Sequence, residues 1–532
     1  MSGAAVADQG PGEAAAWKPR ANPWLIAIVV TLAAFMEVLD TTIVNVALPH
    51  IAGAMSSSND ESTWTLTSYL VANSIVLPIS GWFARIIGRK RYFLICIAMF
   101  TLASFLCGIA GSLWQLILFR LIQGFFGGGL QPNQQSIVLD TFEPAKRGAA
   151  FGVVAIATVI APVMGPTVGG WLTDNFSWQW IFLINVPVGI FTFFAVAALV
   201  EDPPWLAREQ KGERNVDYIG LSLITIGFGC LQVVMDRGED LDWFGSGFIR
   251  LFSLLAFIGL VGAVFWLLHA RNPVVNIRVM ADRNFSIGCL TIFLMAMVLY
   301  SSAVLLPQLV QTRLGYTATW AGLMLMPGSL VVPVLIPLVG RLMKYVQTRF
   351  VIMLGFALLG LALVYSHHIT PDIDFRTLMM MRAAQTVGLA FLFVPISTVT
   401  YITLPKEQNA DGAALFTMFR NLAGSIGISA ATALVTERSQ VRMAHLQPHM
   451  TPLEQPYVDY LQHVQQGLVN LGTNAGEAMQ QAAGIAYQTL QQQAAILAYM
   501  DIFGMTAILS FATIPVCFLF SSTKGGGGMP GH

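Results

Sequence analysis

Residues 24–49 read WLIAIVVTLAAFMEVLDTTIVNVALP. Glu37 and Asp40 are the only charged residues in this stretch. A helix needs about 20 mostly apolar residues to cross a bilayer, so the stretch predicts a membrane-spanning helix that carries two carboxylates. The stretch is too long, and too polar in its interior, to be a cleaved signal peptide.

The rest of the chain has the same character. Of its 532 residues, 55% are hydrophobic and 11% are charged, with 28 basic residues balancing 28 acidic ones. Soluble proteins carry about 25% charged residues, so a soluble globular enzyme, a disordered chain and a nucleic-acid-binding protein are excluded. We predict an all-α integral membrane protein with fourteen spans, the other thirteen at roughly 63–84, 92–111, 113–139, 147–173, 178–200, 217–235, 247–269, 285–308, 318–343, 350–366, 376–403, 411–436 and 495–521.

The basic residues predict how these helices are oriented. If the N-terminus is cytoplasmic, nineteen Lys and Arg residues lie in cytoplasmic segments and six lie in external ones. Cytoplasmic loops of membrane proteins carry the excess of positive charge, so we expect both termini in the cytoplasm. Residues 1–22 and 522–532 are then flexible cytoplasmic tails, and 438–494 is a large external insertion.

Several short patterns occur twice in the chain, about 260 residues apart. The paired positions are Pro78 and Pro337, Gly81 and Gly340, Arg85 and Lys344, Lys90 and Arg349, Arg120 and Arg382, and Gln123 and Gln385. The repeat predicts two six-helix bundles, 23–200 and 284–521, joined by a linker, 201–283, that holds two additional helices. Paired halves around a midplane site are typical of alternating-access carriers. We interpret the two linker helices as spacers.

Charges within the spans are the candidate functional groups, because placing one at the centre of a helix costs about 2.5–3.5 kcal/mol on insertion scales. Glu37 and Asp40 are three residues apart and share a helix face with Thr41. Two close carboxylates repel each other, so one of them holds a proton more readily, and an approaching Arg120 opposes this effect. We therefore predict that Asp40, Glu37 and Arg120 couple transport to protons.

Other roles for these residues remain open. Asp40 is alternatively a structural partner of neighbouring helices, and Arg120 a hub of interhelical hydrogen bonds. Glu37 is alternatively a recognition site for cationic drugs, with Thr41 and Gln123 as further candidate substrate-binding residues. Secondary candidates are Arg382, Arg420 and Asp501. The repeat aligns Asp40 and Glu37 near Val298 and Met295, so the acids belong to one half only.

Five motifs, taken together and in order, resemble those of a known family. They are residues 39–49 in the first span, the loop 81–91, the fourth-span segment 120–124, the fifth-span segment 161–170, and residues 178–187. The chain resembles the major facilitator superfamily, and within it the fourteen-helix drug:proton antiporters of the EmrB/QacA type. The long insertion before the last span makes it most similar to the EmrB proteins of tripartite efflux systems. One departure is Arg85, where many members have Asp.

The resemblance implies a proton-driven exporter of hydrophobic compounds in the bacterial inner membrane. It implies a gating role for the loop residues Gly81, Arg85, Gly88 and Arg89. It also implies that the bent fifth span, with Pro162, Gly165, Pro166, Gly169 and Gly170, packs against the other half and seals the path. The expected partners are a periplasmic adaptor and an outer-membrane channel. The insertion 438–494 either docks the adaptor or forms an amphipathic hairpin on the membrane surface.

Several kinds of chemistry have no motif in the sequence. There is no phosphate-binding G-x-x-x-x-G-K-[ST] loop and no hydrolase motif, and no two of the five cysteines have C-x-x-C spacing. We therefore predict no enzyme activity, cofactor or metal site, and an ion gradient as the energy source, with sodium as an alternative to protons. Alternative functions are a dedicated exporter of one metabolite, such as a fatty acid or siderophore, and a non-transporting receptor or membrane enzyme.

Overall fold

A computed structural model describes residues 19–203 and 216–521. The N-terminal tail up to residue 18 and the C-terminal tail 522–532, both predicted to be flexible, lie outside the described residues. Within the described ranges every regular element is a helix, as predicted. Thirteen of these helices are long and apolar enough to cross a membrane, and a bent pair, Lys146–Pro162 with Met164–Asn175, makes a fourteenth span.

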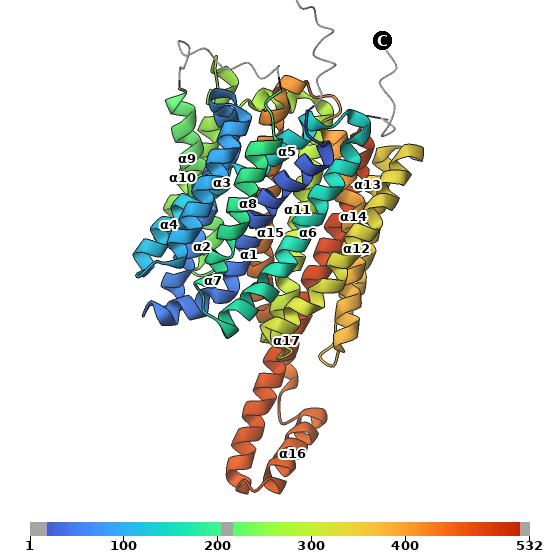
Figure 1. Cartoon of the computed structure of the whole chain (residues 1–532). Coiled ribbons are helices and arrows are strands. Elements are labelled where there is room, and N and C mark those ends of the chain that lie inside the picture. Colours follow the sequence, from blue (N-terminus) through green and yellow to red (C-terminus); the bar gives the residue numbers. More distant parts are fainter. Residues whose placement is uncertain (1–18, 204–215, 522–532) are drawn as a thin grey trace, which may run out of the picture.

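The helices fall into the two halves and the linker that the sequence predicts (Figure 1). The first half contains α1 (Pro23–Ala54), α2 (Asn59–Ile87), α3 (Arg89–Gly108), α4 (Leu113–Gly127), α5 (Leu130–Thr141), α6 (Pro144–Asn175), α7 (Trp180–Leu183) and α8 (Asn185–Leu199). The linker contains α9 (Tyr218–Arg237) and α10 (Gly247–His269). The second half contains α11 (Arg283–Thr312), α12 (Ala318–Tyr345), α13 (Thr348–Ser366), α14 (Phe375–Thr400), α15 (Asn409–Leu446), α16 (Gln455–Asn470) and α17 (Ala475–Thr513).

Local signals explain where the first helices begin and end. The side chain of Asn22 accepts a hydrogen bond from Trp24 N at the start of α1, and Ser58 with Glu61 forms a capping box at the start of α2. Between α2 and α3 the chain turns at Gly88, whose φ of 91° lies in the left-handed region that favours glycine. This single residue reverses the chain between two spans.

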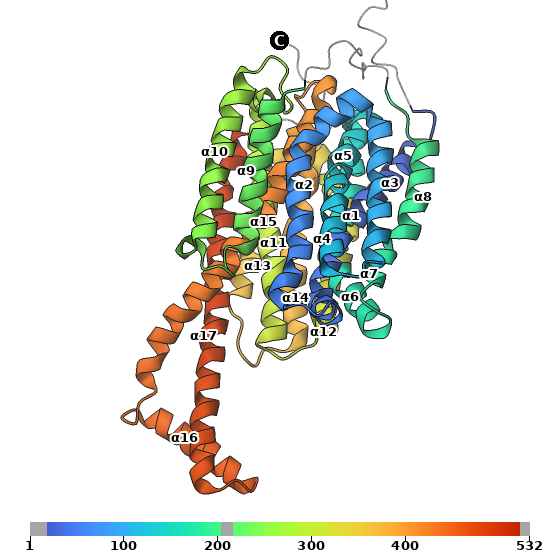
Figure 2. The same ribbon diagram turned by 90° about the vertical axis from the view of Figure 1, so that its left-hand side faces the viewer.

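The two ends of the bundle differ, and each is named here for what it carries. At the terminal end lie the first and last described residues, and from the opposite, projecting end α16 and the adjoining parts of α15 and α17 extend away from the bundle (Figures 1 and 2). Arg442 on α15 forms an ion pair with Asp501 on α17 at 2.5 Å, which joins the two helices near the base of the projection. Helix α15 continues beyond the end of the predicted span 411–436, and α17 begins before the start of the predicted span 495–521. Both helices therefore extend beyond the apolar stretches from which the spans were predicted.

The two halves meet along two seams. In one, α6 packs on α12, and in the other α2 packs on α15. The linker helix α9 lies beside the second seam, against both α2 and α15. The Gln232 side-chain oxygen on α9 accepts hydrogen bonds from Ser74 of α2 at 2.9 Å and from Ser425 of α15 at 3.2 Å. A single side chain of the linker therefore contacts both halves.

The motif glycines Gly165, Gly169 and Gly170 of the fifth span face α1 of their own half, and not the other half as expected from the sequence. A Cβ at Gly165 would lie 2.2 Å from the Thr42 hydroxyl, and one at Gly169 would lie 2.7 Å from Ile43. Both neighbours belong to α1 of the same half. Residues four apart lie on one face of a helix, so the motif forms a close contact between α6 and α1. Contact with the other half is made from Gly152 and Thr167, which face Ile336 and Gly322 of α12.

The bend in α6 fits its two prolines. The segments before and after Val163 are inclined at 42° to each other, and Pro162 and Pro166 lie at and just after this break. Proline lacks the backbone N–H that an α-helix uses and its ring clashes with the preceding turn, which accounts for the bend.

We predict that Gly165→Ala destabilises the protein by about 1–3 kcal/mol, because the added methyl group has to displace Thr42 and the α1 backbone. The expected readout is a lower midpoint of thermal unfolding for the purified protein in detergent. Gly170→Ala is the matched control, since its Cβ would meet nothing closer than 3.9 Å. Equal midpoints for the two variants would contradict the close α1–α6 contact.

Candidate functional site

The centre of the first half contains a buried ion pair between two of the predicted residues. Arg120 Nη1 on α4 lies 2.5 Å from Asp40 Oδ2 on α1, and both side chains are 0% exposed. The other carboxylate oxygen, Asp40 Oδ1, accepts hydrogen bonds from Gln123 Nε2 at 3.0 Å and from Asn185 Nδ2 at 2.9 Å. Helices α1, α4 and α8 therefore converge on one carboxylate.

Arg120 makes further contacts that fix its position. Its Nε donates to the Thr65 carbonyl oxygen at 3.2 Å, and Nη1 also donates to Gln123 Oε1 at 2.9 Å. The guanidinium carbon lies 4.1 Å from the centre of the Tyr69 ring, a cation–π contact. Its Nη2 has no hydrogen-bond partner among the described residues. The arginine is thus the hub of a network that joins α1, α2 and α4.

The second half repeats this arrangement without the acid. Arg382 Nη1 donates to the Ser302 hydroxyl at 3.1 Å and to Gln385 Oε1 at 3.2 Å. Arginine and acceptor are 80 residues apart in each half, so the counterpart of Asp40 is Ser302 and the sequence alignment with Val298 was wrong. Asp40 and Val298 are 258 positions apart, whereas Arg120 and Arg382 are 262 apart, as are Asp40 and Ser302.

The second predicted carboxylate, Glu37, has a separate set of partners. Its Oε1 accepts from Asn73 Nδ2 at 3.0 Å and from the Tyr69 hydroxyl at 3.4 Å. Its Oε2 accepts from Gln131 Nε2 on α5. The residues predicted beside it are placed differently: Thr41 donates to the Glu37 backbone oxygen at 2.9 Å, and Gln123 belongs to the Asp40 network. Tyr69 contacts both Glu37 and Arg120, so it links the two sets of partners.

Gln131 also connects Glu37 to the other half of the molecule. Its side-chain oxygen accepts a hydrogen bond from Arg420 Nη2, and Arg420 lies on α15. Nearby, Thr417 of α15 donates to Gln135 Oε1 of α5 at 2.9 Å. The carboxylate of one half and the guanidinium of the other are therefore separated by a single amide group.

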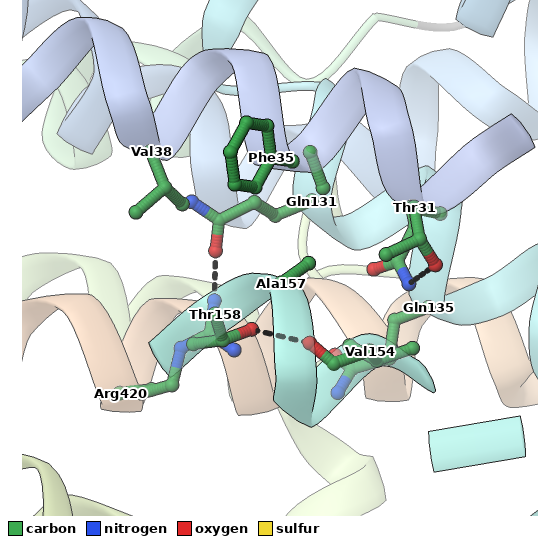
Figure 3. Close-up of a pocket in the computed structure, with 11 residues that line it drawn as sticks. Thr31, Phe35, Val38, Gln131, Gln135, Val154, Ala157, Thr158 and Arg420 are labelled. Atoms are coloured by element: carbon green, nitrogen blue, oxygen red, sulfur yellow. Dashed lines mark hydrogen bonds between the residues drawn. The ribbon is translucent and has the colours of Figure 1, made fainter. Parts of the chain in front are cut away.

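A small cavity lies next to these contacts, between α1, α5, α6 and α15 (Figure 3). Its polar walls come mainly from three glutamines of α5 and from Arg420, and its apolar walls come from α1 and α6. The lining residues are Thr31, Ala34, Phe35, Val38, Gln131, Gln134, Gln135, Val154, Ala157, Thr158 and Arg420. Thr41 and Gln123 do not line it.

Sequence reasoning missed the three glutamines, although the sequence contained a signal for them. Residues 131–135 read QPNQQ within a predicted membrane span. Five consecutive residues with four amide side chains are as unusual there as a charge, and all of them are buried. Amides do not change a charge count, so a search for intramembrane charges does not detect them.

The predicted gating loop lies at the terminal end and contacts the second half. Arg85 Nη1 on α2 lies 2.7 Å from Asp411 Oδ2 on α15. Beside it, a Cβ at Gly81 would lie 2.8 Å from Asp411 Oδ1, so the two helices are in close contact. Arg89 is paired with Asp140 within the first half, and Asp140 also accepts from Asn409 of the second half at 2.6 Å.

The sequence match agrees with this architecture. The family model described as Major Facilitator Superfamily matches residues 30–428, most of the chain. The chain belongs to the major facilitator superfamily. The structure agrees with this assignment, because it contains two halves that meet along two seams and an arginine–glutamine contact that occurs once in each half.

Curated relatives place the chain more closely within the superfamily. It is 38% identical to "Multidrug export protein EmrB" of Escherichia coli K12 over 88% of this chain and 90% of the relative. It is 36% identical to "Fatty acid resistance protein FarB" of Neisseria gonorrhoeae over 86% and 90% of the two chains. The chain is thus an EmrB-type member of the superfamily, as its motifs indicated.

A solved structure shares the fold at low sequence identity. The human organic anion transporter MFSD10 has a TM-score of 0.58 and 14% identity, over 92% of this chain and 99% of the human one. Within the described ranges of this superfamily member, no group of three or more His, Cys, Asp or Glu side chains is placed to hold a metal ion.

We predict that the pair between Arg85 and Asp411 holds the terminal end closed. Arg85→Asp places two carboxylates together, so the helices should separate more often and a cysteine at Thr417 should react several-fold faster with a thiol reagent. The background is a variant whose five natural cysteines are replaced by serine. The reversed pair, Arg85→Asp with Asp411→Arg, should restore slow labelling, and equally fast labelling in the double variant would contradict a direct pairing.

Proposed function

We propose that this chain is a proton-driven exporter of hydrophobic toxic compounds across the bacterial inner membrane. The main support is the Asp40–Arg120 pair, a buried carboxylate and guanidinium whose contacts involve α1, α2, α4 and α8 in the middle of a transporter fold. Membership of the superfamily and similarity to a multidrug export protein favour transport by alternating access. Export of this kind would contribute to antibiotic resistance.

The two carboxylates suit different tasks in this scheme. The partners of Asp40 all belong to the first half, so they stay together when the halves move apart. A proton on Asp40 removes the charge that Arg120 is paired with, and breaking a buried pair costs about 3–5 kcal/mol. Protonation therefore loosens the contacts among α1, α4 and α8 within the first half. We infer that the loosened first half favours one of the two conformations, which is the requirement for coupling.

Glu37 instead responds to the movement itself. Its link to Arg420 through Gln131 crosses from one half to the other. When the halves separate near α5 and α15, Arg420 leaves and Glu37 loses a stabilising positive charge. We infer that Glu37 is the residue through which the open or closed state of the cavity affects proton binding.

We propose the orientation that the basic residues predict, with the terminal end in the cytoplasm and the projecting end in the periplasm. The projection of α15, α16 and α17 then lies where a periplasmic adaptor can reach it. Its exposed apolar side chains include Leu453, 96% exposed, and Leu471, 85% exposed, one beyond each end of α16. Support for a tripartite pump with an outer-membrane channel comes from this surface.

One alternative has an observation of its own. The relative named as a fatty acid resistance protein matches the chain almost as well as the multidrug exporter does. Arg420 at the cavity wall is a suitable partner for a carboxylate, so a dedicated exporter of a fatty acid, or of another acidic metabolite such as a siderophore, is the second candidate. A receptor without transport is the third and weakest candidate, because a receptor does not need two halves that meet along two seams.

We predict that Asp40→Asn abolishes proton-driven transport. In liposomes with an imposed pH gradient, movement of a fluorescent lipophilic cation should fall to the rate of protein-free liposomes. The reason is that the asparagine amide neither binds nor releases a proton near neutral pH. Asp501→Asn is the matched control, since Asp501 binds Arg442 at the base of the projection and should not be needed for movement through the bundle. Normal transport by Asp40→Asn would assign Asp40 a structural role.

A separate prediction concerns the projection. Leu453→Asp with Leu471→Asp should leave transport in liposomes unchanged, because both side chains are remote from the bundle. In cells that produce the adaptor and the channel, the same double variant should lower the tolerated drug concentration several-fold. The control exchanges the same residues for methionine, which keeps the surface apolar. Full resistance in the aspartate variant would show that these leucines do not take part in docking the adaptor.

A further inference from the structure

The Gln131 side chain occupies an unusual electrostatic position. Its amide nitrogen donates to the Glu37 carboxylate, and its amide oxygen accepts from the Arg420 guanidinium (Figure 3 shows the second contact). Glu37 and Arg420 are both buried, and they belong to different halves of the molecule. The amide thus lies between a negative and a positive charge, with its donor end toward the first and its acceptor end toward the second.

The direction of this amide is set by its partners. In the reverse orientation, the Gln131 oxygen would face a carboxylate that has no proton to donate, and the nitrogen would face a guanidinium that cannot accept. The site therefore selects a group with a donor at one end and an acceptor at the other. A neutral amide meets this need only in part, because it places partial charges where full charges of the opposite sign would be stabilised more strongly.

The cavity next to Gln131 has a further polar group without a partner. Gln135 is 1% exposed and lines the cavity, and its Nε2 has no hydrogen-bond partner among the described residues. An unpaired buried donor is unfavourable, and a ligand acceptor would remove that penalty. Arg420 lines the same cavity, so two donors are available on the side of α5 and α15.

We propose that this cavity binds amphoteric compounds, whose cationic nitrogen pairs with Glu37 and whose carboxylate pairs with Arg420 and Gln135. The cavity has a volume of about 10 Å³, so a ligand enters only as the two halves separate. The Gln131 side chain then moves aside, since it makes the same two contacts more weakly. Phe35, Val38 and Val154 supply apolar walls for the hydrocarbon part of the ligand. This inference rests on the proposed function, because it takes the cavity as part of the transport path.

Compounds with one charge fit the site less well. A cation that displaces Gln131 pairs with Glu37 but leaves Arg420 buried without its partner. An anion, such as a fatty acid, pairs with Arg420 but leaves Glu37 without one. A buried charge that loses its partner is strongly unfavourable, so the zwitterion gains from both contacts together. The preference for a zwitterion arises because the first half places a negative charge, Glu37, at this cavity and the second half places a positive charge, Arg420, there.

The test uses four ligands with the same hydrocarbon body. Biphenylalanine is a zwitterion, its methyl ester is a cation, its N-acetyl derivative is an anion, and the N-acetyl methyl ester is neutral. Binding to the full-length protein in lipid nanodiscs is measured by calorimetry without a pH gradient. We expect the zwitterion to bind about tenfold more tightly, or better, than each of the other three, as a charged hydrogen bond at each end implies.

Two variants assign the two ends. Arg420→Gln should remove the advantage of the ligands with a free carboxylate, and Glu37→Gln should remove the advantage of those with a free amine. Arg442→Gln is the matched control on the same helix as Arg420, because its guanidinium pairs with Asp501 at the base of the projection and its loss should not alter the order of the four ligands. A loss of fold would instead weaken all four ligands equally, including the neutral one.

Each outcome decides the proposal separately from the transport function. Equal affinities for the four ligands, or tightest binding of the anion or the cation, would overturn it even if pH-driven transport of a neutral dye proceeds normally. Preferential binding of the zwitterion with loss in both variants would support it even if liposomes show no dependence on the pH gradient. In the latter case the proposed energy source fails and the ligand class stands.

Discussion

The ion pair between Asp40 and Arg120 lies where water does not reach, so each charge depends on partners supplied by the protein. This requirement brings α1, α4 and α8 together and aligns Thr65 of α2 with the guanidinium. In the second half the buried arginine also has partners supplied by the protein, because Arg382 donates to Gln385 and to Ser302, which stands in place of the acid. The asymmetry between the halves is thus chemical rather than architectural.

Much of the fold follows from local features of the sequence. Apolar runs predicted all fourteen spans, and charges within them pointed to Asp40, Glu37 and Arg120, because both signals are carried by single residues and their neighbours. The partners of these charges were harder to predict from the sequence. Gln131 and Ser302 are uncharged and become significant only through contacts between distant helices. The face on which Gly165 packs is likewise set by the orientation of a whole helix, which motif spacing does not contain.

The contacts across the seams differ in chemistry along the molecule. At the terminal end they are ionic, between Arg85 and Asp411. Near the cavity they pass through amides, from Arg420 to Gln131 and from Thr417 to Gln135. Amide contacts can be exchanged for contacts with a ligand at little cost, whereas an ion pair is exchanged less easily. Under the proposed function, the ionic part of this contact holds the halves together and the amide part is available to a transported compound.

The linker helices have a consequence for how such proteins are built. From the sequence we interpreted the two linker helices as spacers, yet Gln232 of α9 accepts hydrogen bonds from Ser74 and Ser425, one in each half. Without α9, these two hydroxyls would lose the side-chain oxygen that accepts their hydrogen bonds. A fourteen-helix carrier of this type is therefore not a twelve-helix carrier with a detachable pair. Helix α9 is part of the contact between the two halves, so removal of the linker pair would change that contact as well as the length of the connection.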